Sequence, residues 1–513
     1  MNDLQIITVA ALILFAAAMA GIGIFSARKV KNMEGFLLGG RKMGAWVSAF
    51  AYGTSYFSAV IFVGYAGKHG WDIGIGSIWI GVGNAVVGCL LAWLLLAKRT
   101  RSMTRRLQSK TLPEFLQARY DSKKLKIVAA LLIFIFLVPY SAAVYKGLGS
   151  MFNTIFPDVS VNLCMAIIAV LTAVYLVLGG YLATAYTDFI QGIIMLGGIV
   201  CMIIAVVNSP SVGGFGGFLS NLAAVPNNGD GIDGNQLTSL FGGSSFSFLC
   251  VNILLTSLGT WGLPQMITKF YTIKDTKSVK HATVISTVFC AVIGCGAYFV
   301  GSLSRLVLNN TLPEGGHDAV IPQMLLAALG NGKLTMIILA VILILLLSAS
   351  MSTLASIVLS SSSAISVDLL PEFTKKLEGK KQISVTRLLC LLFVTLSFIF
   401  ATANISVIVN IMSFSWGVVA GCFIGPYLWG LFSKKVTRTA VWVAMLLSML
   451  TVAIPTVIIT VISGFSTAVS KAPEMGVFAM LVSILTVPIV SLFTKKYPDE
   501  HINKIFKSEK EEK

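Results

Sequence analysis

Thirteen apolar segments follow one another along this 513-residue chain, and each is long enough to cross the roughly 30 Å hydrocarbon core of a lipid bilayer. Only 12% of the residues are charged, about half the share that is usual in water-soluble domains. A backbone in lipid must satisfy its own hydrogen bonds, so segments of this length are expected to be helices. The sequence therefore predicts an all-α polytopic membrane protein with about 13 transmembrane helices, at residues 5–26, 45–68, 72–97, 124–150, 161–179, 186–207, 246–268, 281–306, 334–365, 384–403, 407–432, 438–463 and 475–494.

Lysine and arginine are distributed unevenly between the loops. If the N-terminus lies outside, alternate loops face inward, and those loops hold 33 of the 38 basic residues, whereas the outward loop at 208–245 holds none. This asymmetry is the positive-inside pattern. It explains the net charge of +17 by membrane topology, without a nucleic-acid partner. We expect a multi-pass plasma-membrane protein with its N-terminus outside and its C-terminus in the cytoplasm.

Two of the predicted spans contain residues that weaken a helix near its middle. Gly53 and the hydroxyl residues that follow it interrupt residues 45–68, and a glycine and proline cluster at 259–264 interrupts residues 246–268. Interrupted helices at corresponding positions of two halves indicate the binding site of a secondary transporter. The alternative is two unrelated kinks that serve close packing.

The span at residues 334–365 has no charge but many serines. Within it Ala349, Ser352 and Thr353 are spaced i, i+3 and i+4, so they share one helix face. Two hydroxyls and a nearby carbonyl on one face are suitable oxygen ligands for a small cation. The alternative is that these serines permit close helix packing and bond to their own helix.

Ionisable residues are rare in the predicted spans. Asp188 is the only acidic residue placed clear of the span ends, and a mid-membrane carboxylate costs about 2.5–3.5 kcal/mol, so it should have a partner. The alternative is that Asp188 lies near the inner surface of the membrane, where its carboxylate is hydrated or caps a helix. Lys146 is expected to extend outward with no role in ion binding. Tyr140 lies deeper, either as a packing residue or in a substrate cavity.

Several kinds of chemistry are missing from the sequence. No G-x-x-x-x-G-K-[ST] loop is present, so transport driven by ATP within this chain is not expected. The four histidines lack zinc spacing, and the eight cysteines form no C-x-x-C pair. A proton relay would normally use a series of acidic or histidine residues within the membrane. We therefore expect a carrier and not an enzyme.

Seven motifs together resemble the sodium:solute symporter family, over about residues 34–433. In order they are GFLLGGRKMG, GTSYFSA, TLPEFLQARY, GGYLATAYTDFIQG, GLPQMITKF, SMSTLASIVLSSSSAISVDL and SWGVVAGCFIGPYLWG. The resemblance implies a LeuT-type five-plus-five inverted repeat with two broken helices and one leading helix. The implied regions are the leading helix and basic inner loop at 1–44, the first repeat at 45–207, the outer loop at 208–245, the second repeat at 246–433, two C-terminal helices at 434–494 and a charged cytoplasmic tail at 495–513.

The same resemblance implies a sodium site. By motif match, Thr54 and Phe57 would contribute backbone carbonyls at the first break. Ala349 would contribute its carbonyl, and Ser352 and Thr353 their hydroxyls. Na⁺ is accordingly the expected coupling ion.

A possible second sodium site and the solute are less well matched to the family. The carboxylate of Asp188 corresponds to a second sodium ligand of some members, but Ala349 stands where a two-sodium sialic acid transporter has serine. Sodium/proline symporters have an aspartate at the position of Tyr56, and a tryptophan and a tyrosine at those of Thr256 and Thr260. The identity of the solute is therefore not implied.

The function that these features indicate is Na⁺-coupled symport of a small organic solute into the cell by alternating access. The solute could be an amino acid such as proline, an organic acid or a sugar-like molecule. The alternatives are a proton-coupled solute carrier and a non-transporting membrane sensor or channel on the same scaffold. The substrate-binding residues expected near the two breaks are Ser58, Tyr140, Thr260, Trp261 and Gln265.

Overall fold

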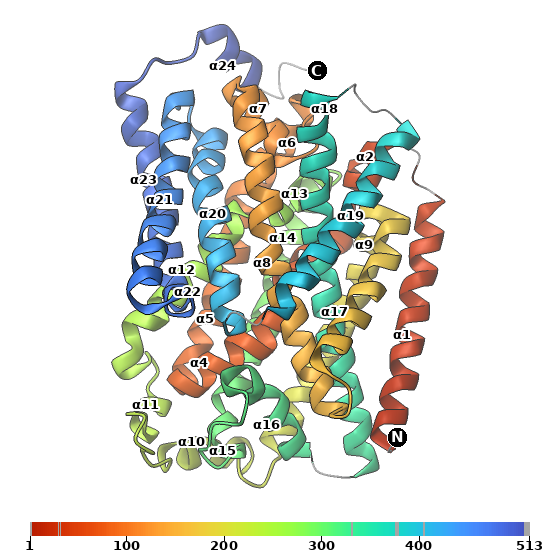
Figure 1. Ribbon diagram of the computed structural model, residues 1–513, viewed down its shortest axis with the longest axis vertical. Coiled ribbons are helices and arrows are strands. Elements are labelled where there is room, and N and C mark those ends of the chain that lie inside the picture. Colours follow the sequence, from red (N-terminus) through yellow and green to blue (C-terminus); the bar gives the residue numbers. More distant parts are fainter. Residues whose placement is uncertain are drawn as a thin grey trace.

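The computed structural model describes residues 3–28, 30, 32–329, 332–374, 379–403 and 406–506. In these residues it is a bundle of helices, most of which run along the longest axis of the molecule (Figure 1). The helix α1 begins at one end of that axis, and α24 lies at the other (Figure 1). The last residues of the predicted tail, 507–513, lie outside the described residues. The prediction of an all-helical protein is confirmed.

The elements of the first half are α1 (Asp3–Ala27), α2 (Met33–Leu38), η1 (Gly39–Arg41), α3 (Ala45–Tyr56), η2 (Val60–Tyr65), α4 (Ala66–Ile73), η3 (Gly74–Ser77), α5 (Ile78–Gly83), η4 (Asn84–Leu91), η5 (Trp93–Ala97), α6 (Lys98–Arg106), α7 (Leu112–Tyr120), α8 (Lys123–Ile155), α9 (Val161–Val207), α10 (Gly214–Ala223) and α11 (Gly234–Thr238). Those of the second half are η6 (Gly243–Ser245), α12 (Phe246–Gly262), α13 (Pro264–Thr272), α14 (Thr276–Ser302), α15 (Ser304–Val307), η7 (Gly316–Ala319), α16 (Val320–Leu329), α17 (Lys333–Ser363), η8 (Ala364–Leu369), α18 (Leu370–Phe373), α19 (Gly379–Thr402), α20 (Ile408–Phe432), α21 (Arg438–Ser463), α22 (Phe465–Ser470), α23 (Ala472–Phe493) and α24 (Asp499–Phe506).

Eleven helical runs within the described residues are long and apolar enough to cross a membrane. The run Val60–Arg106 contains the predicted span 72–97 and the end of the predicted span 45–68, and the predicted span 161–179 corresponds to a shorter apolar helix, Val161–Val174. The count of about 13 is therefore not reproduced as thirteen separate runs. The long helix α9 is not straight, because Gly180 has φ 56° and ψ −151°, a conformation that favours glycine.

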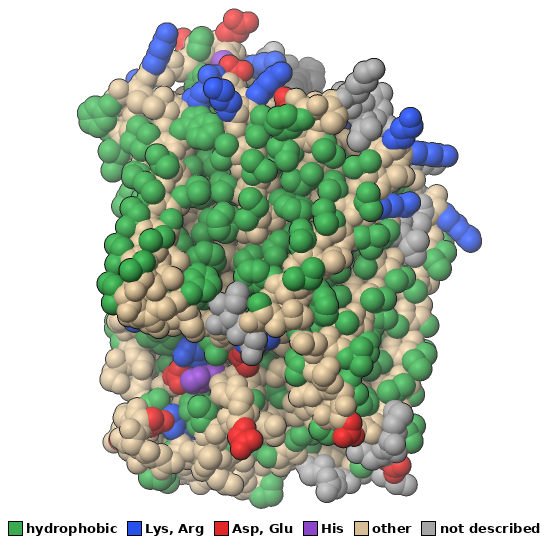
Figure 2. Space-filling model, viewed as in Figure 1, with side chains coloured by type: hydrophobic (Ala, Val, Ile, Leu, Met, Phe, Trp, Pro, Cys, Tyr) green, Lys and Arg blue, Asp and Glu red, His purple; other side chains and the backbone are tan. Residues whose placement is uncertain are grey.

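Side chains on the surface separate by type along the long axis (Figure 2). Hydrophobic side chains cover the middle of the visible face, where lipid would surround the protein. Lysine and arginine gather at the end where α24 lies, which we call the basic end. The other end, where α1 begins, is called the opposite end. This separation agrees with a polytopic membrane protein.

Both predicted helix breaks are present. The helix α3 ends at Tyr56, and Phe57 is extended, with φ −103° and ψ 127°, before helical structure resumes at η2. Between α12 and α13, Leu263 is extended and Pro264 begins the next helix, where a missing N–H costs nothing. Gly53 itself is helical. A Cβ atom there would lie 2.3 Å from the ring of Phe289, so this glycine permits a close approach of α14.

The two broken segments meet at the basic end. The backbone of Met43, just before α3, accepts a hydrogen bond from the N–H of Lys274 at 3.0 Å and donates one to the carbonyl of Thr272 at 3.1 Å. This short parallel bridge joins the start of the first broken segment to the end of the second. The serine-rich helix α17 packs against α3, α8, α9 and α13, so it borders both breaks.

Candidate functional site

Oxygen atoms of the first break converge on one hydroxyl of α17. The last carbonyls of a helix have no partner within that helix, and at the end of α3 they face α17. The hydroxyl oxygen of Thr353 lies 3.3 Å from the carbonyl oxygens of Thr54 and Ser55, 3.4 Å from that of Phe57, and 3.1 Å from that of Ala349. Four carbonyl oxygens thus surround a single side-chain oxygen.

Three further serines complete the contact between α17 and the first break. Ser352 donates a hydrogen bond to the hydroxyl of Thr54 at 2.7 Å. The hydroxyl of Ser350 accepts one from the N–H of Ala59 at 2.9 Å, and Ser356 lies 2.9 Å from the hydroxyl of Ser55. These contacts hold the unwound residues against α17 over about two helix turns.

This cluster contains more hydrogen-bond acceptors than protons. The hydroxyl of Thr353 has one proton for four carbonyl oxygens, and that of Thr54 already donates to the carbonyl of Phe50 at 2.9 Å. Thr54, Ser352 and Thr353 are fully buried. The C-terminal end of α3 adds the negative end of its helix dipole. A buried group of oxygen atoms with spare lone pairs is suited to a small cation. All five residues predicted for the sodium site contribute oxygen atoms to this group: Thr54, Phe57, Ala349, Ser352 and Thr353.

Asp188, predicted as a possible second sodium ligand, has a protein partner. Its carboxylate lies 3.4 Å from the ammonium of Lys269, and both side chains are buried. Lys269 also donates to the hydroxyl of Ser356 at 3.0 Å and lies 5.2 Å from the ring centre of Tyr181. The partner that this carboxylate was expected to have is therefore a lysine of α13.

Lys269 was missed because the predicted span stopped at residue 268, which placed this lysine in a basic loop. In the structure α13 continues to Thr272, and Lys269 is 1% exposed. If the helix that begins at Pro264 is predicted to continue past residue 268, Gln265 and Lys269 lie on one face of it, because they are four residues apart.

The predicted substrate residues are only partly brought together. Thr260 donates to the carbonyl of Gly88 at 3.1 Å, and the indole of Trp261 donates to the carbonyl of Val87 at 3.0 Å. Both side chains are thus bonded to η4. The hydroxyl of Ser58 accepts the N–H of Val60 at 3.2 Å, which stabilises the first break.

Gln265 is different, because both polar atoms of its buried amide lack a hydrogen-bond partner among the described residues. It lines a narrow cavity with Lys269 and Ser356, and this cavity extends to Lys110 and Thr111 at the start of α7. A buried amide without partners is costly unless a ligand or water supplies them. Gln265 is therefore the predicted substrate residue with the clearest unused hydrogen-bonding capacity.

Tyr140 packs edge-to-face on Trp416 of α20, with ring centres 5.7 Å apart. A Cβ atom on Gly259, beside the second break, would lie 2.5 Å from the Trp416 ring. Trp416 therefore belongs to the same region as Tyr140 and the second break.

A cluster of charged residues joins η7 to its neighbours, toward the opposite end. Asp318 forms an ion pair with Lys146 at 3.1 Å and accepts the N–H of Ile408 at the start of α20. The adjacent His317 lies 3.1 Å from Asp72 of α4. Lys146 was expected to extend outward with no role in ion binding, and the structure shows that its ammonium is paired with a carboxylate. Because η7 is held to three helices, we call this cluster the η7 latch.

A second acidic residue is buried among the helices, just beyond the predicted span at residues 334–365. Asp368 of η8 is fully buried within the apolar run Thr335–Phe373. Its carboxylate accepts the hydroxyl of Thr111, just before α7, at 2.9 Å. This contact joins a short helix of the basic end to the end of the serine-rich segment.

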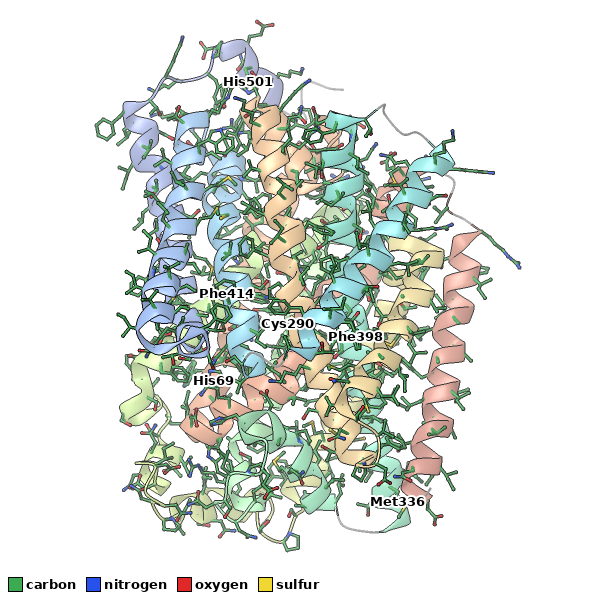
Figure 3. The ribbon with its side chains drawn as sticks, viewed as in Figure 1. His69, Cys290, Met336, Phe398, Phe414 and His501 are labelled. Atoms are coloured by element: carbon green, nitrogen blue, oxygen red, sulfur yellow. The ribbon has the colours of Figure 1, made fainter. Side chains whose placement is uncertain are left out.

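The histidines do not form a common site. Figure 3 shows His69 and His501 far apart along the long axis. His69 stacks between Tyr65 and Phe248, with ring centres 5.0 and 5.2 Å away. Within the described part of the chain, no group of three or more histidine, cysteine or acidic side chains could hold a metal ion. The oxygen cluster at the first break remains the candidate ion site.

Comparison with known proteins identifies relatives over almost the whole chain. The sodium:solute symporter family matches residues 36–448. The osmoregulated proline transporter OpuE of Bacillus subtilis is 27% identical over 489 residues, covering 94% of each chain. The sodium/proline symporter of Escherichia coli is 27% identical, covering 84% of each. Among solved structures, that of a Na⁺-coupled sialic acid symporter has a TM-score of 0.76 at 17% identity, covering 96% of this chain and 99% of the other.

Proposed function

Because the chain belongs to the sodium:solute symporter family, we propose that the oxygen cluster between α3 and α17 holds the Na⁺ whose gradient drives its transport. The observation that carries this proposal is the convergence of four carbonyl oxygens on the Thr353 hydroxyl. Carbonyl and hydroxyl oxygens are the ligands that hard cations prefer. The fold supports this proposal, since it is shared with a Na⁺-coupled symporter.

A cation at this position would couple two parts of the protein. Thr54 and Phe57 belong to the first broken segment, whereas Ala349, Ser352 and Thr353 belong to α17. A Na⁺ bound by both would stabilise conformations in which they touch, and it would lose ligands when they separate. Such a difference in affinity between two states is what coupling requires.

The proposed solute is a small organic molecule, and an amino acid is the first class to test because the curated relatives named above are proline transporters. We place it beside the two breaks. Gln265 offers an unused amide there, and Tyr140 and Trp416 offer aromatic surfaces. Ser58, Thr260 and Trp261 would act mainly by shaping the breaks, since they already bond to the backbone.

The proposed orientation places the basic end in the cytoplasm, following the positive-inside pattern. The cavity that reaches Gln265 from the start of α7 would then be the inner path. The η7 latch would close the outer path in the conformation that the structure represents. Inward release of solute and Na⁺ would follow, and breaking the latch would reopen the outer side.

Uptake into proteoliposomes tests this function, with Na⁺ and pH gradients imposed separately on a panel of amino acids, organic acids and sugars. We expect accumulation of one solute class only with an inward Na⁺ gradient. Accumulation driven by a pH gradient without Na⁺ would instead establish the proton-coupled alternative. Replacing both Ser352 and Thr353 by alanine should abolish the Na⁺ dependence.

A further inference from the structure

The start of α7 lies beside the path by which a solute would leave the protein at the basic end (Figure 1). Residues 110–113 line the narrow cavity that reaches Gln265 and Lys269. Thr111, Leu112 and Pro113 are buried, so they are packed against their neighbours in the conformation that the structure represents. A solute that leaves through this cavity must pass residues 110–113, and these residues must therefore move.

A reciprocal helix cap fixes the start of α7. The hydroxyl of Thr111 accepts the N–H of Glu114 at 3.2 Å, and the carboxylate of Glu114 accepts the N–H of Lys110 at 2.6 Å. The cap leaves the hydroxyl proton of Thr111 free to bond elsewhere. Thr111 donates this proton to the carboxylate of Asp368 at 2.9 Å. The cap of α7 is thereby attached to η8, which continues directly from α17.

The carboxylate of Asp368 has few other partners. It is fully buried, and its second oxygen has no hydrogen-bond partner among the described residues. Within the same residues Asp368 forms no ion pair, and the neighbouring Lys126 is paired instead with Glu372. Asp368 lies on a turn of π-helix, a rare geometry that is frequent at functional sites. A buried carboxylate that accepts one neutral donor is costly to keep out of water.

Two opposing contributions therefore act on the start of α7. The hydrogen bond from Thr111 to Asp368 exists only while residues 110–113 stay in place. When they move away, water can enter the cavity and hydrate the carboxylate. The hydrogen bond favours the closed arrangement and hydration favours the open one. Such a balance keeps both conformations accessible, as alternating access requires.

We propose that Asp368 is the positioning residue of an inner gate formed by residues 110–113. Its carboxylate holds Thr111 while the inner path is closed, and hydration of the same carboxylate stabilises the gate once it is open. This inference rests on the proposed function, because it takes the cavity at the start of α7 as the inner path. It gives Asp368 a role in the conformational change and none in contacting Na⁺ or solute.

The test measures access to the cavity in the full-length protein, lacking its native cysteines, in membrane vesicles. Ser360→Cys places a thiol on α17 in the wall of the same cavity, where an impermeant maleimide can reach it from the cytoplasmic face. Thr111→Val should speed this labelling about tenfold or more, because the closed gate then buries a carboxylate that has no hydrogen bond. In the same variant, labelling of Asn153→Cys from the outer face should slow, since that residue lines the cavity beside the η7 latch.

Variants of the charge separate a gate from a damaged helix cap. Asp368→Asn keeps an acceptor oxygen for Thr111 and costs less to bury, so alone it should slow the labelling of Ser360→Cys. Combined with Thr111→Val, it should return labelling to within about twofold of the wild type. Thr111→Ser keeps the hydroxyl and should label like the wild type. The matched control is Thr437→Val, which removes the buried cap of α21 at a position that does not line the cavity.

Labelling of Ser360→Cys that stays within twofold of the wild type in Thr111→Val would overturn the proposal. Equally fast labelling of Thr111→Val with and without Asp368→Asn would overturn it too, because loss of the cap alone would then explain the effect. If Thr111→Val is not monodisperse on size exclusion, Asp368→Asn alone decides, and labelling as fast as the wild type or faster refutes the gate. Failure of the proposed function is a separate result, since uptake without Na⁺ would leave these labelling rates as expected.

Discussion

Replacing Thr353 by valine removes the oxygen atom at the centre of the proposed sodium site and changes the shape of the side chain very little. That hydroxyl lies 3.1 to 3.4 Å from four carbonyl oxygens. Valine keeps the β-branch that the helix already accommodates, so α17 should remain intact. The change therefore separates the loss of a ligand from the loss of packing.

The magnitude follows from the kind of interaction lost. A polar contact to a charged group contributes about 1.5–3 kcal/mol. Each 1.4 kcal/mol corresponds to tenfold in affinity, so the half-saturating Na⁺ concentration should rise about 10- to 150-fold. The unfolding free energy without Na⁺ should fall by only about 1 kcal/mol, because the hydroxyl donates a single hydrogen bond.

Thermal unfolding across a Na⁺ titration measures both quantities in one experiment, since an ion that binds only the folded state raises its stability by mass action. The matched control is Thr395→Val, which removes an exposed threonine that bonds only to the carbonyl of Leu391 in its own helix. That control should titrate like the wild type. A Thr353→Val protein whose half-saturating Na⁺ concentration stays within twofold of the wild type would refute the assignment of this site.

Three further changes follow from the same contacts. Gly301→Ala should lower the thermal midpoint, because the new Cβ would lie 2.1 Å from a carbonyl oxygen of α4 and overpacking typically costs about 1–3 kcal/mol; an unchanged midpoint would contradict this. Asp318→Asn should open the η7 latch by removing the ion pair with Lys146. Labelling of a cysteine at Asn153, in the adjoining cavity, by an impermeant maleimide should then increase in a protein lacking its native cysteines. Gln265→Leu should weaken solute binding about fivefold or more and leave Na⁺ binding unchanged; equal loss of both would exclude a solute contact.

Matched variants control for the first two of these changes. Gly21→Ala places a Cβ atom on α1 with nothing within 4 Å, so its thermal midpoint should not fall. Asp158→Asn removes an exposed carboxylate from the residues between α8 and α9, so maleimide labelling should not change. For Gln265→Leu, the Na⁺ titration of the same protein is the internal control.

The helix breaks could be predicted because their signals are local. Pro264 cannot donate a backbone hydrogen bond, and together with Gly259 and Gly262 it favours a helix break at which the proline begins the next helix. Gly53 was a less direct signal. It marked the correct segment, but the chain unwinds only at Phe57, and Gly53 serves instead to admit the ring of Phe289. A glycine in a sequence does not reveal whether it breaks a helix or admits a neighbour.

The sodium-site residues lie on two segments about 300 positions apart. Spacing alone placed Ala349, Ser352 and Thr353 on one helix face, because the helical period is fixed. Their contact with Thr54 and Phe57 was implied only by the family resemblance. No local pattern states which helix packs on which, and the packing of α17 on α3 supplies that information.

The charged contacts were the least predictable. Lys269 and Asp188 are 81 positions apart, and Lys146 and Asp318 are farther still. Each pair forms because folding brings two helices together and excludes water from between them. Thr260 and Trp261 illustrate the same limit, since their side chains bond to η4, an element that no pattern near them indicates.

The sequence by itself determined that this chain is a bundle of membrane helices, where two of them break, and which helix carries hydroxyls. These are consequences of hydrophobic length, backbone chemistry and helical period, which act within about one span. The tertiary structure alone decided which oxygen atoms share one small volume and which buried charges face each other. Those outcomes depend on distances between segments far apart in the chain, and only packing sets such distances.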